Sequence, residues 1–173
     1  LSIDMSLPAQ PTLATHFNVS DETAQLTLSV FMVGFAFAQL FVGYLADAWG
    51  RRPVMIGGLI VFSVAGVATA VSPTIEVLLL FRVLQGIGAA AGPVVARAMV
   101  RDTQPAHLAA RMLSMMLAAL AVAPMIAPVI GGVLLGALGW RSIFATLAVC
   151  GVAMLLISHV TLVETLPPER RNP

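Results

Sequence analysis

GYLADAWGRRP, residues 43–53, is the one dense cluster of charged and turn-forming residues between two long apolar runs. Residues 23–46 and residues 53–75 carry no charged side chain. At about 1.5 Å per helical residue, each run can cross the roughly 30 Å hydrocarbon core of a membrane. Gly50 and Pro53 favour a tight reversal of the chain between them. We therefore predict two membrane-spanning helices joined by an eleven-residue charged turn.

The composition supports a membrane protein. The chain has 173 residues, of which 59% are hydrophobic and 10% are charged, and its mean hydropathy is +0.97. A soluble domain carries about 25% charged residues, so this chain could not cover a water-facing surface. Its single cysteine, Cys150, lies in an apolar run, and its three histidines are scattered. We therefore expect no disulfide, no metal site, no catalytic constellation and no cofactor, so the chain is not predicted to be an enzyme.

Further apolar runs predict one all-α integral membrane bundle over residues 1–173. Residues 1–16 contain two prolines and are too short to cross a membrane, so they are expected to form the remainder of a first helix whose beginning is missing. The chain is thus expected to be a segment of something longer. The five complete spans are predicted at 23–46, 53–72, 77–96, 106–138 and 142–163. Ser20 is the expected N-cap of the first of them, with Asp21 and Glu22 in its first turn.

Arginine placement predicts the orientation. All nine basic residues are arginines, and seven of them fall in or next to loops at one end of the predicted bundle. The positive-inside rule places that end, with the turn at 43–53 and the C-terminus, in the cytoplasm. These seven are Arg51, Arg52, Arg97, Arg101, Arg111, Arg170 and Arg171.

Arg82 lies about six residues inside a predicted span. A charge at that depth is costly unless it is paired or faces a wet cavity. One interpretation is an arginine that extends to the outer interface. The other is a functional pair with Asp4, which also lies near the outer end of a span. A carboxylate beside a guanidinium in a low dielectric can load and release a proton when its surroundings change.

Small residues and prolines mark two helices for close packing. Gly88 and Gly92 form a GxxxG pattern just after Gly86, which allows helix backbones to approach. Pro128 and the pair Gly131 and Gly132 predict a kinked helix that packs closely on a neighbour. An ordinary proline-bent span with no special role explains this second pattern equally well.

Several motifs resemble those of the major facilitator superfamily. Residues 43–52 resemble the loop signature between its second and third helices, and residues 80–88, LFRVLQGIG, resemble the fourth-helix signature of its proton-driven members. Residues 127–132, APVIGG, are similar to its fifth-helix antiporter signature. Residues 4–8 and 164–170 look like those of the bicyclomycin-resistance (Bcr/CflA-type) drug–proton antiporters.

The resemblance implies a role for each motif. Such transporters have twelve helices in two halves, and this chain matches the N-terminal half with most of its first helix missing. Asp4 and Arg82 would couple protons to the substrate. Gly43 would admit a helix of the missing C-terminal half, and residues 128–132 would shape a seal. The cytoplasmic latch would comprise Gly43, Asp47, Gly50, Arg51 and Arg52.

The expected function is efflux of amphipathic drug-like small molecules from the bacterial inner membrane in exchange for protons, driven by the proton gradient. Its partners would be that substrate, protons, the lipid bilayer and the missing half, with no nucleic acid. Two other readings stay open. One is a membrane-embedded half-module that binds or assembles with a partner without transporting alone. The other is an uptake facilitator of the same fold.

Overall fold

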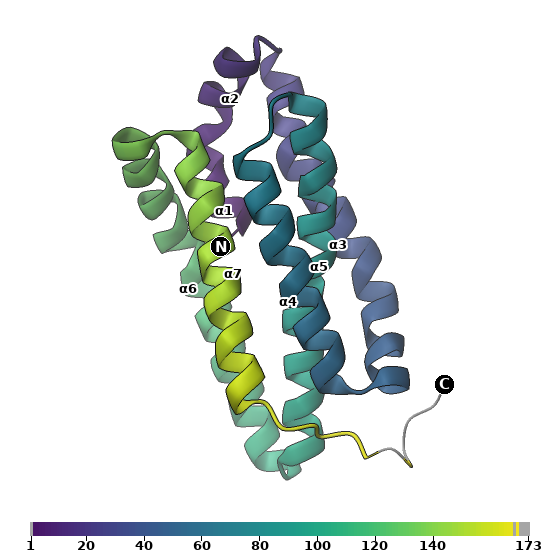
Figure 1. Ribbon diagram of the computed structural model, residues 1–173. Helices are drawn as coiled ribbons and strands as arrows, with labels where there is room; N and C mark the ends of the chain where they lie inside the picture. The colour runs from purple at the N-terminus through teal and green to yellow at the C-terminus, as the bar shows by residue number, and fades with distance from the viewer. Residues whose placement is uncertain (1, 168, 170–173) are drawn as a thin grey trace.

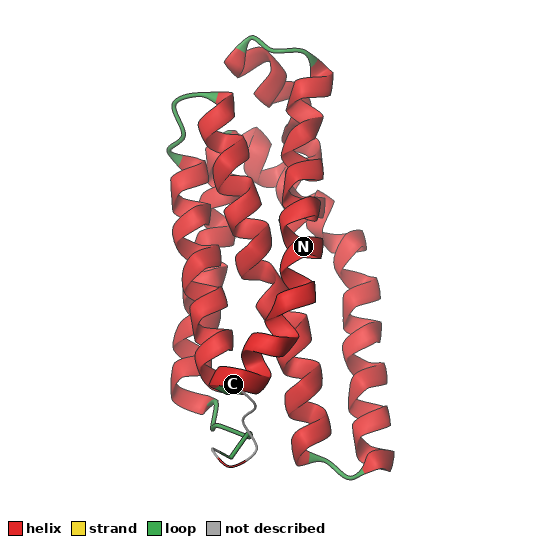
Figure 2. Cartoon of the chain, turned by 90° about the vertical axis from the view of Figure 1, so that its right-hand side faces the viewer, coloured by secondary structure: helices red, strands yellow, loops and turns green. Residues whose placement is uncertain are grey.

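A computed structural model describes residues 2–167 and 169, and within them the chain is helical and contains no strand (Figures 1 and 2). Five of the helices are long and apolar enough to cross a membrane, as the sequence predicts. Three short elements precede them and together take the place of one continuous first helix. The elements are α1 (Ser2–Ser6), η1 (Leu7–Ala9), α2 (Gln10–Phe17), α3 (Asp21–Trp49), α4 (Arg51–Ala70), α5 (Ile75–Thr103), α6 (Ala106–Leu138) and α7 (Trp140–Thr161).

The predicted eleven-residue turn is wrong in length. Helix α3 continues to Trp49 and α4 begins at Arg51, so that Gly50 alone joins them. Gly50 has a φ of 105°, a conformation that a residue with a side chain rarely adopts, and this lets one residue reverse the chain. Gly139, with a φ of 80°, joins α6 to α7 in the same way. The charged residues that the sequence places in a loop therefore lie on helix ends.

Helix boundaries follow local chemistry at several other ends. The side chain of Ser20 accepts a hydrogen bond from the backbone N–H of Thr23, so the predicted N-cap of α3 is confirmed. Thr74 caps α5 in the same way. Helix α5 also continues to Thr103, beyond the predicted end of its span, so Arg97 and Arg101 lie on its last turns rather than in a loop.

Glycines bring α5 into backbone contact with α3 and α4, the two helices against which it packs most extensively. A Cβ at Gly86 would collide with the carbonyl oxygen of Phe31 in α3, and one at Gly88 would collide with the backbone of Phe62 in α4. Helix α3 and α4 contribute Gly34 and Gly58, whose Cβ positions are blocked by α5 in return. Small residues therefore allow the close approach of three helices.

The predicted GxxxG pairing needs a correction. A Cβ at Gly92 would meet nothing within 4 Å, and the glycine that faces Gly88 is Gly58 of the neighbouring helix. Gly92 lies instead on the face of α5 that lines a groove. On α6, Gly131 lies against the backbone of Met5 in α1, whereas Gly132 has open space around it. One glycine of each predicted pair therefore makes a backbone contact.

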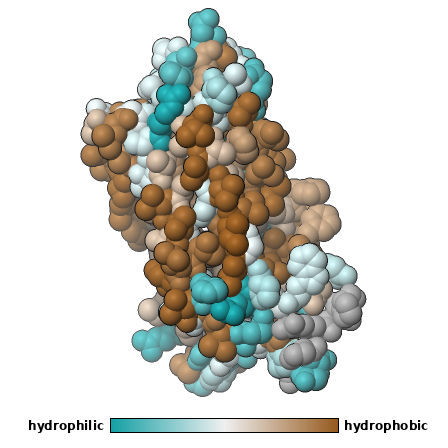
Figure 3. Space-filling view, in the orientation of Figure 1, coloured by the Kyte–Doolittle hydropathy of each residue, from teal (hydrophilic) through white to brown (hydrophobic). Residues whose placement is uncertain are grey.

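The outer surface matches a bilayer. Apolar side chains cover the middle of the bundle, and hydrophilic residues gather toward its two ends (Figure 3). Helix α6 is the most exposed of the five spans, because 11% of the residues in its most apolar 18-residue stretch are buried. Because side chains such as Met125 and Val133 on α6 could not face water in such number, the chain is a multi-pass membrane protein.

The glycine contacts lead to a stability prediction. Replacing Gly86 by valine forces the backbones of α3 and α5 apart, so we expect the free energy of unfolding to fall by about 1–3 kcal/mol. Replacing Gly92 on the same helix by valine should have a much smaller effect, since a Cβ there meets nothing. Denaturant titrations in detergent micelles, followed by circular dichroism, would measure both. Equal losses for the two variants would contradict the packing assigned to Gly86.

Candidate functional site

Arg82 is fully buried, seven residues from the start of α5, so the alternative of an arginine extending to the interface is excluded. Its guanidinium donates three hydrogen bonds to neutral groups. Nε donates to the carbonyl oxygen of Thr27 at 3.2 Å, and Nη1 donates to the side-chain oxygens of Ser2 at 3.2 Å and Gln85 at 2.8 Å. The Gln10 side chain in turn bonds the Thr27 hydroxyl. A polar network therefore runs through α1, α2, α3 and α5.

Aromatic rings complete the surroundings of this charge. The guanidinium carbon of Arg82 lies 4.4 Å from the centre of the Phe31 ring and 5.5 Å from that of Phe144. Ring faces stabilise a desolvated cation. Between the two described residues Arg82 and Asp4, the structure has no ion pair, so the expected direct pairing is not formed here. They are linked through α1, because Arg82 bonds Ser2, two residues before Asp4.

Asp4 lies on the wall of a groove of about 790 Å³ that α1 and five longer helices surround. Among the described lining residues Asp4 is the one with a charge, and Ser2 and Ser158 add hydroxyls. The remaining lining is apolar and includes three methionines, whose flexible side chains adapt to ligands of different shape. These lining residues are Ile3, Phe31, Phe35, Met55, Leu59, Ala89, Gly92, Pro93, Ala96, Met116, Ala119, Leu120, Ala123, Met154 and Leu162.

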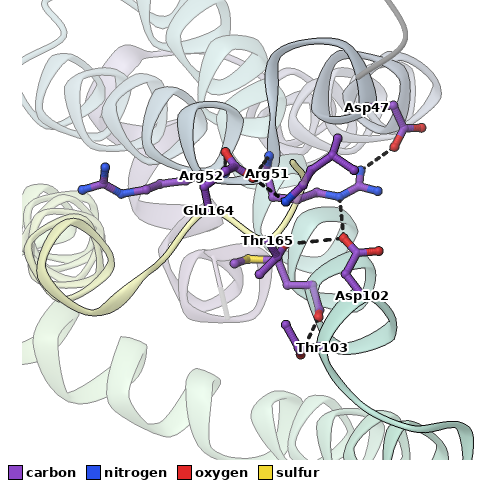
Figure 4. Close-up of polar contacts among 9 residues, drawn as sticks. Asp47, Arg51, Arg52, Asp102, Thr103, Glu164 and Thr165 are labelled. Carbon is purple, nitrogen blue, oxygen red and sulfur yellow. Dashed lines mark hydrogen bonds and ion pairs between the residues drawn. The ribbon is translucent and has the colours of Figure 1, made fainter. Parts of the chain in front are cut away.

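A charge network joins the helix ends at the opposite end of α5 (Figure 4). The Arg51 guanidinium contacts Asp47 of α3 at 2.6 Å through Nη1 and Asp102 of α5 at 3.0 Å through Nε. The Asp102 side chain is 26% exposed and the Asp47 side chain is 55% exposed, so the pair of Arg51 with Asp102 is the better shielded from water of the two. The planar fork of arginine serves two carboxylates at once. One side chain thus ties together three helices.

Glu164, in the segment after α7, caps the N-terminus of α4. Its two carboxylate oxygens accept hydrogen bonds from the backbone N–H groups of Arg51 at 3.0 Å and Arg52 at 3.2 Å. Gly50 has no side chain for this purpose, and a carboxylate is favoured at the positive end of a helix dipole. The Arg52 side chain donates to the carbonyl oxygen of His159 in α7 at 3.0 Å. The C-terminal segment is therefore fastened to the turn at Gly50.

Sequence reasoning found part of this site. Of the residues in the expected latch, Asp47, Arg51 and Arg52 take part in the network, Gly50 forms the turn, and a Cβ at Gly43 would meet nothing within 4 Å. Sequence reasoning missed two members of the network, Asp102 and Glu164. It also missed the residues that surround Arg82, which are Gln85, Thr27 and Ser2. Gln85 had a readable signal, since it follows Arg82 by three residues and so shares its helix face.

Comparisons with known proteins agree with the fold. The family model described as Major Facilitator Superfamily matches residues 1–173. The multidrug resistance protein MdtL of Escherichia coli O81 (strain ED1a) is 39% identical over 165 residues, which are 95% of this chain and 42% of that protein. The protein of the same name from Shigella dysenteriae serotype 1 (strain Sd197) is 38% identical with the same coverage. The chain thus spans less than half the length of these curated relatives.

Solved structures show the same architecture. An inward-open conformation of the xylose transporter XylE from E. coli superposes with a TM-score of 0.73 at 18% identity, over 98% of this chain and 45% of that one. The human organic anion transporter MFSD10 gives a TM-score of 0.64 at 26% identity, over 96% of this chain and 39% of that one. The predicted fold class is confirmed: an all-α membrane bundle with the extent of one half of such a transporter.

The capping of α4 leads to a second prediction. Replacing Glu164 by glutamine removes the negative charge and leaves one acceptor oxygen for two N–H groups, so we expect a loss of about 1 kcal/mol in the free energy of unfolding. Replacing Glu169, an exposed glutamate in the same segment, by glutamine is the matched control. Denaturant titration in micelles would measure the difference. If both variants unfold like the unmodified chain, Glu164 is not a stabilising cap.

Proposed function

The chain belongs to the Major Facilitator Superfamily, and from that we propose that it forms one half of a transporter that expels amphipathic drug-like compounds in exchange for protons. The observation that carries the proposal is an apolar groove in which Asp4 is the one charged residue among the described lining, next to Ser2, which accepts a hydrogen bond from the buried Arg82. The relatives named as multidrug resistance proteins support this substrate class. The match to a family of transporters favours transport over catalysis for this chain.

The groove suits a substrate with a large apolar surface and few polar groups. Its methionines offer contacts that can rearrange, and the rings of Phe31 and Phe35 offer flat surfaces for stacking. The Asp4 carboxylate and two hydroxyls supply the polar contacts. Binding would therefore depend on burial of apolar area rather than on one fixed set of hydrogen bonds, as broad recognition requires.

Proton coupling is assigned to Asp4 and Arg82. Protonation of Asp4 removes the one charge among the described residues of the groove wall. This changes the free energy with which a substrate binds beside it. Arg82 holds α1 in place through Ser2 and so links the position of Asp4 to the packing of α3, α5 and α7. The proton and the substrate would thereby act on the same wall of the groove, so that binding of one would disfavour binding of the other.

The remaining motif residues are assigned to the movement of this half. The Arg51 network and the Glu164 cap would keep the ends of α3, α4, α5 and α7 together as a rigid body. The open face at Gly43 would receive a helix of a second half, which would supply the other wall of the groove. Pro128, Gly131 and Gly132 would shape a tight seal between α6 and its neighbour, since Gly131 already lies against α1. The arginine-rich end would face the cytoplasm in a bacterial inner membrane.

Replacing Arg82 by glutamine tests the coupling in the complete transporter, reconstituted into proteoliposomes with an imposed pH gradient. The variant is expected to equilibrate a lipophilic fluorescent dye down the dye gradient but to lose at least tenfold of its accumulation against it. The physical reason is that a neutral amide cannot replace the three hydrogen bonds and the ring contacts of the guanidinium. Replacing Asp4 by asparagine should give the same pattern, because an amide does not load a proton.

Replacing Arg141 by glutamine is the matched control, since this arginine stacks on Trp140 away from the groove. Uphill transport by the Arg82 variant at the unmodified rate would contradict the coupling assignment. Dye movement in the direction of proton entry would identify an uptake transporter. A complete reading frame that ends near residue 173, in a protein that binds the dye without moving it, would identify a half-module.

A further inference from the structure

A second cavity, of about 290 Å³, lies between α3 and α5 at the end of the bundle that carries the Arg51 network. It is separate from the apolar groove, because the described lining residues of the two cavities do not overlap. We call it the arginine cleft, defined by Gly43, Asp47, Arg51, Val94, Arg97, Ala98 and Arg101.

The arginine cleft has an excess of positive charge. Arg51 is already engaged by Asp47 and Asp102, so it offers little to a further ligand. Arg97 and Arg101 are four residues apart and thus share a face of α5, and in the part of the chain that the structure describes neither makes an ion pair. Together with Arg51, these two arginines set three guanidinium groups against the carboxylates of Asp47 and Asp102, which leaves an excess of about one positive charge at the cleft.

The depth of these arginines matches the polar layer of a membrane. Arg97 lies 22 residues after Ile75, the start of α5, which corresponds to about 33 Å along the helix. The hydrocarbon core is about 30 Å thick, so a helix that enters it near Ile75 carries Arg97 and Arg101 to the level of the lipid headgroups on the other side. Both side chains are exposed.

An apolar surface leads to the cleft from the hydrocarbon side. On α3, Val33, Phe37, Leu40 and Tyr44 follow one another at helical spacing, and Leu40 and Tyr44 are 75% and 61% exposed. Tyr44 is the neighbour of Gly43 in the cleft, and a Cβ at Gly43 would meet nothing within 4 Å. The cleft thus opens next to a stripe on which acyl chains can lie.

We propose that the arginine cleft binds the phosphate of an anionic membrane lipid, held by Arg97 and Arg101, with its acyl chains along the stripe from Val33 to Tyr44. Guanidinium groups bind phosphate oxygens through paired hydrogen bonds, and basic pockets between membrane helices at the cytoplasmic side suit such headgroups. A free phosphate shares this chemistry but has no acyl chains that could contact the apolar stripe. The site does not depend on transport, and a helix packed on Gly43 would compete with the lipid.

The test uses this chain in nanodiscs and native mass spectrometry. Phosphatidylglycerol is expected to be retained in preference to phosphatidylethanolamine, and inorganic phosphate at millimolar concentration should not displace it. The double variant Arg97→Gln with Arg101→Gln should bind phosphatidylglycerol roughly thirtyfold more weakly, because each arginine near a membrane surface contributes a factor of about five. The double lysine variant keeps both charges but loses the paired hydrogen bonds of the guanidinium groups, so its binding should fall between that of the unmodified chain and that of the double glutamine variant.

Arg111→Gln is the matched control, because this exposed arginine of α6 lies outside the cleft. Circular dichroism of each variant would verify that the helices are intact. Equal retention of both lipids, or unchanged retention by the double glutamine variant, would overturn the proposal. Full displacement by inorganic phosphate would also overturn it, because the cleft would then be a general anion site.

Discussion

The buried charge of Arg82 constrains the packing of this bundle more than any other group. A guanidinium in an apolar interior is costly unless hydrogen bonds and polarisable neighbours surround it. The chain meets most of this need with a backbone carbonyl from α3, a hydroxyl from α1, an amide from α5 and rings from α3 and α7, while Nη2 of Arg82 has no hydrogen-bond partner among the described residues. Four elements must therefore converge on one point, and their relative positions are set there.

The Arg51 network imposes a comparable constraint at the other end of α5. There the charges are paired rather than dispersed, and the partners are carboxylates from α3 and α5 and the carboxylate that caps α4. Between the two ends, Gly86 and Gly88 hold three helix backbones together without polar groups. Helix α6 shares little of either constraint, because its contacts with α5 are few and its surface is mostly exposed. The bundle thus combines a tightly fastened core with one helix, α6, that packs mainly on α1 and α7.

Much of this arrangement is readable from the sequence, because hydropathy and charge follow simple rules in a membrane. The number of spans, the N-cap at Ser20 and the cluster around Arg51 all come from such rules. The partners of Arg82 do not, since a carbonyl of Thr27 belongs to the backbone and leaves no mark in composition. Gly58 and Gly57 are adjacent, and only the rotation of α4 decides which of them meets α5. The turn at Gly50 is shorter than predicted because the residues around it are compatible with helix.

The cap on α4 has a consequence for the order of assembly in a cell. Glu164 follows Arg51 by 113 residues, so the groups that complete the start of α4 are synthesised only after α5, α6 and α7 have been made. Until then the hairpin of α3 and α4 lacks this cap, and the backbone N–H groups of Arg51 and Arg52 depend on other acceptors such as water. The segment after α7 therefore completes the turn at Gly50 only after the five spans described here have been made. A chain that ends just before residue 164 keeps the five spans described here but leaves the turn at Gly50 without its carboxylate cap.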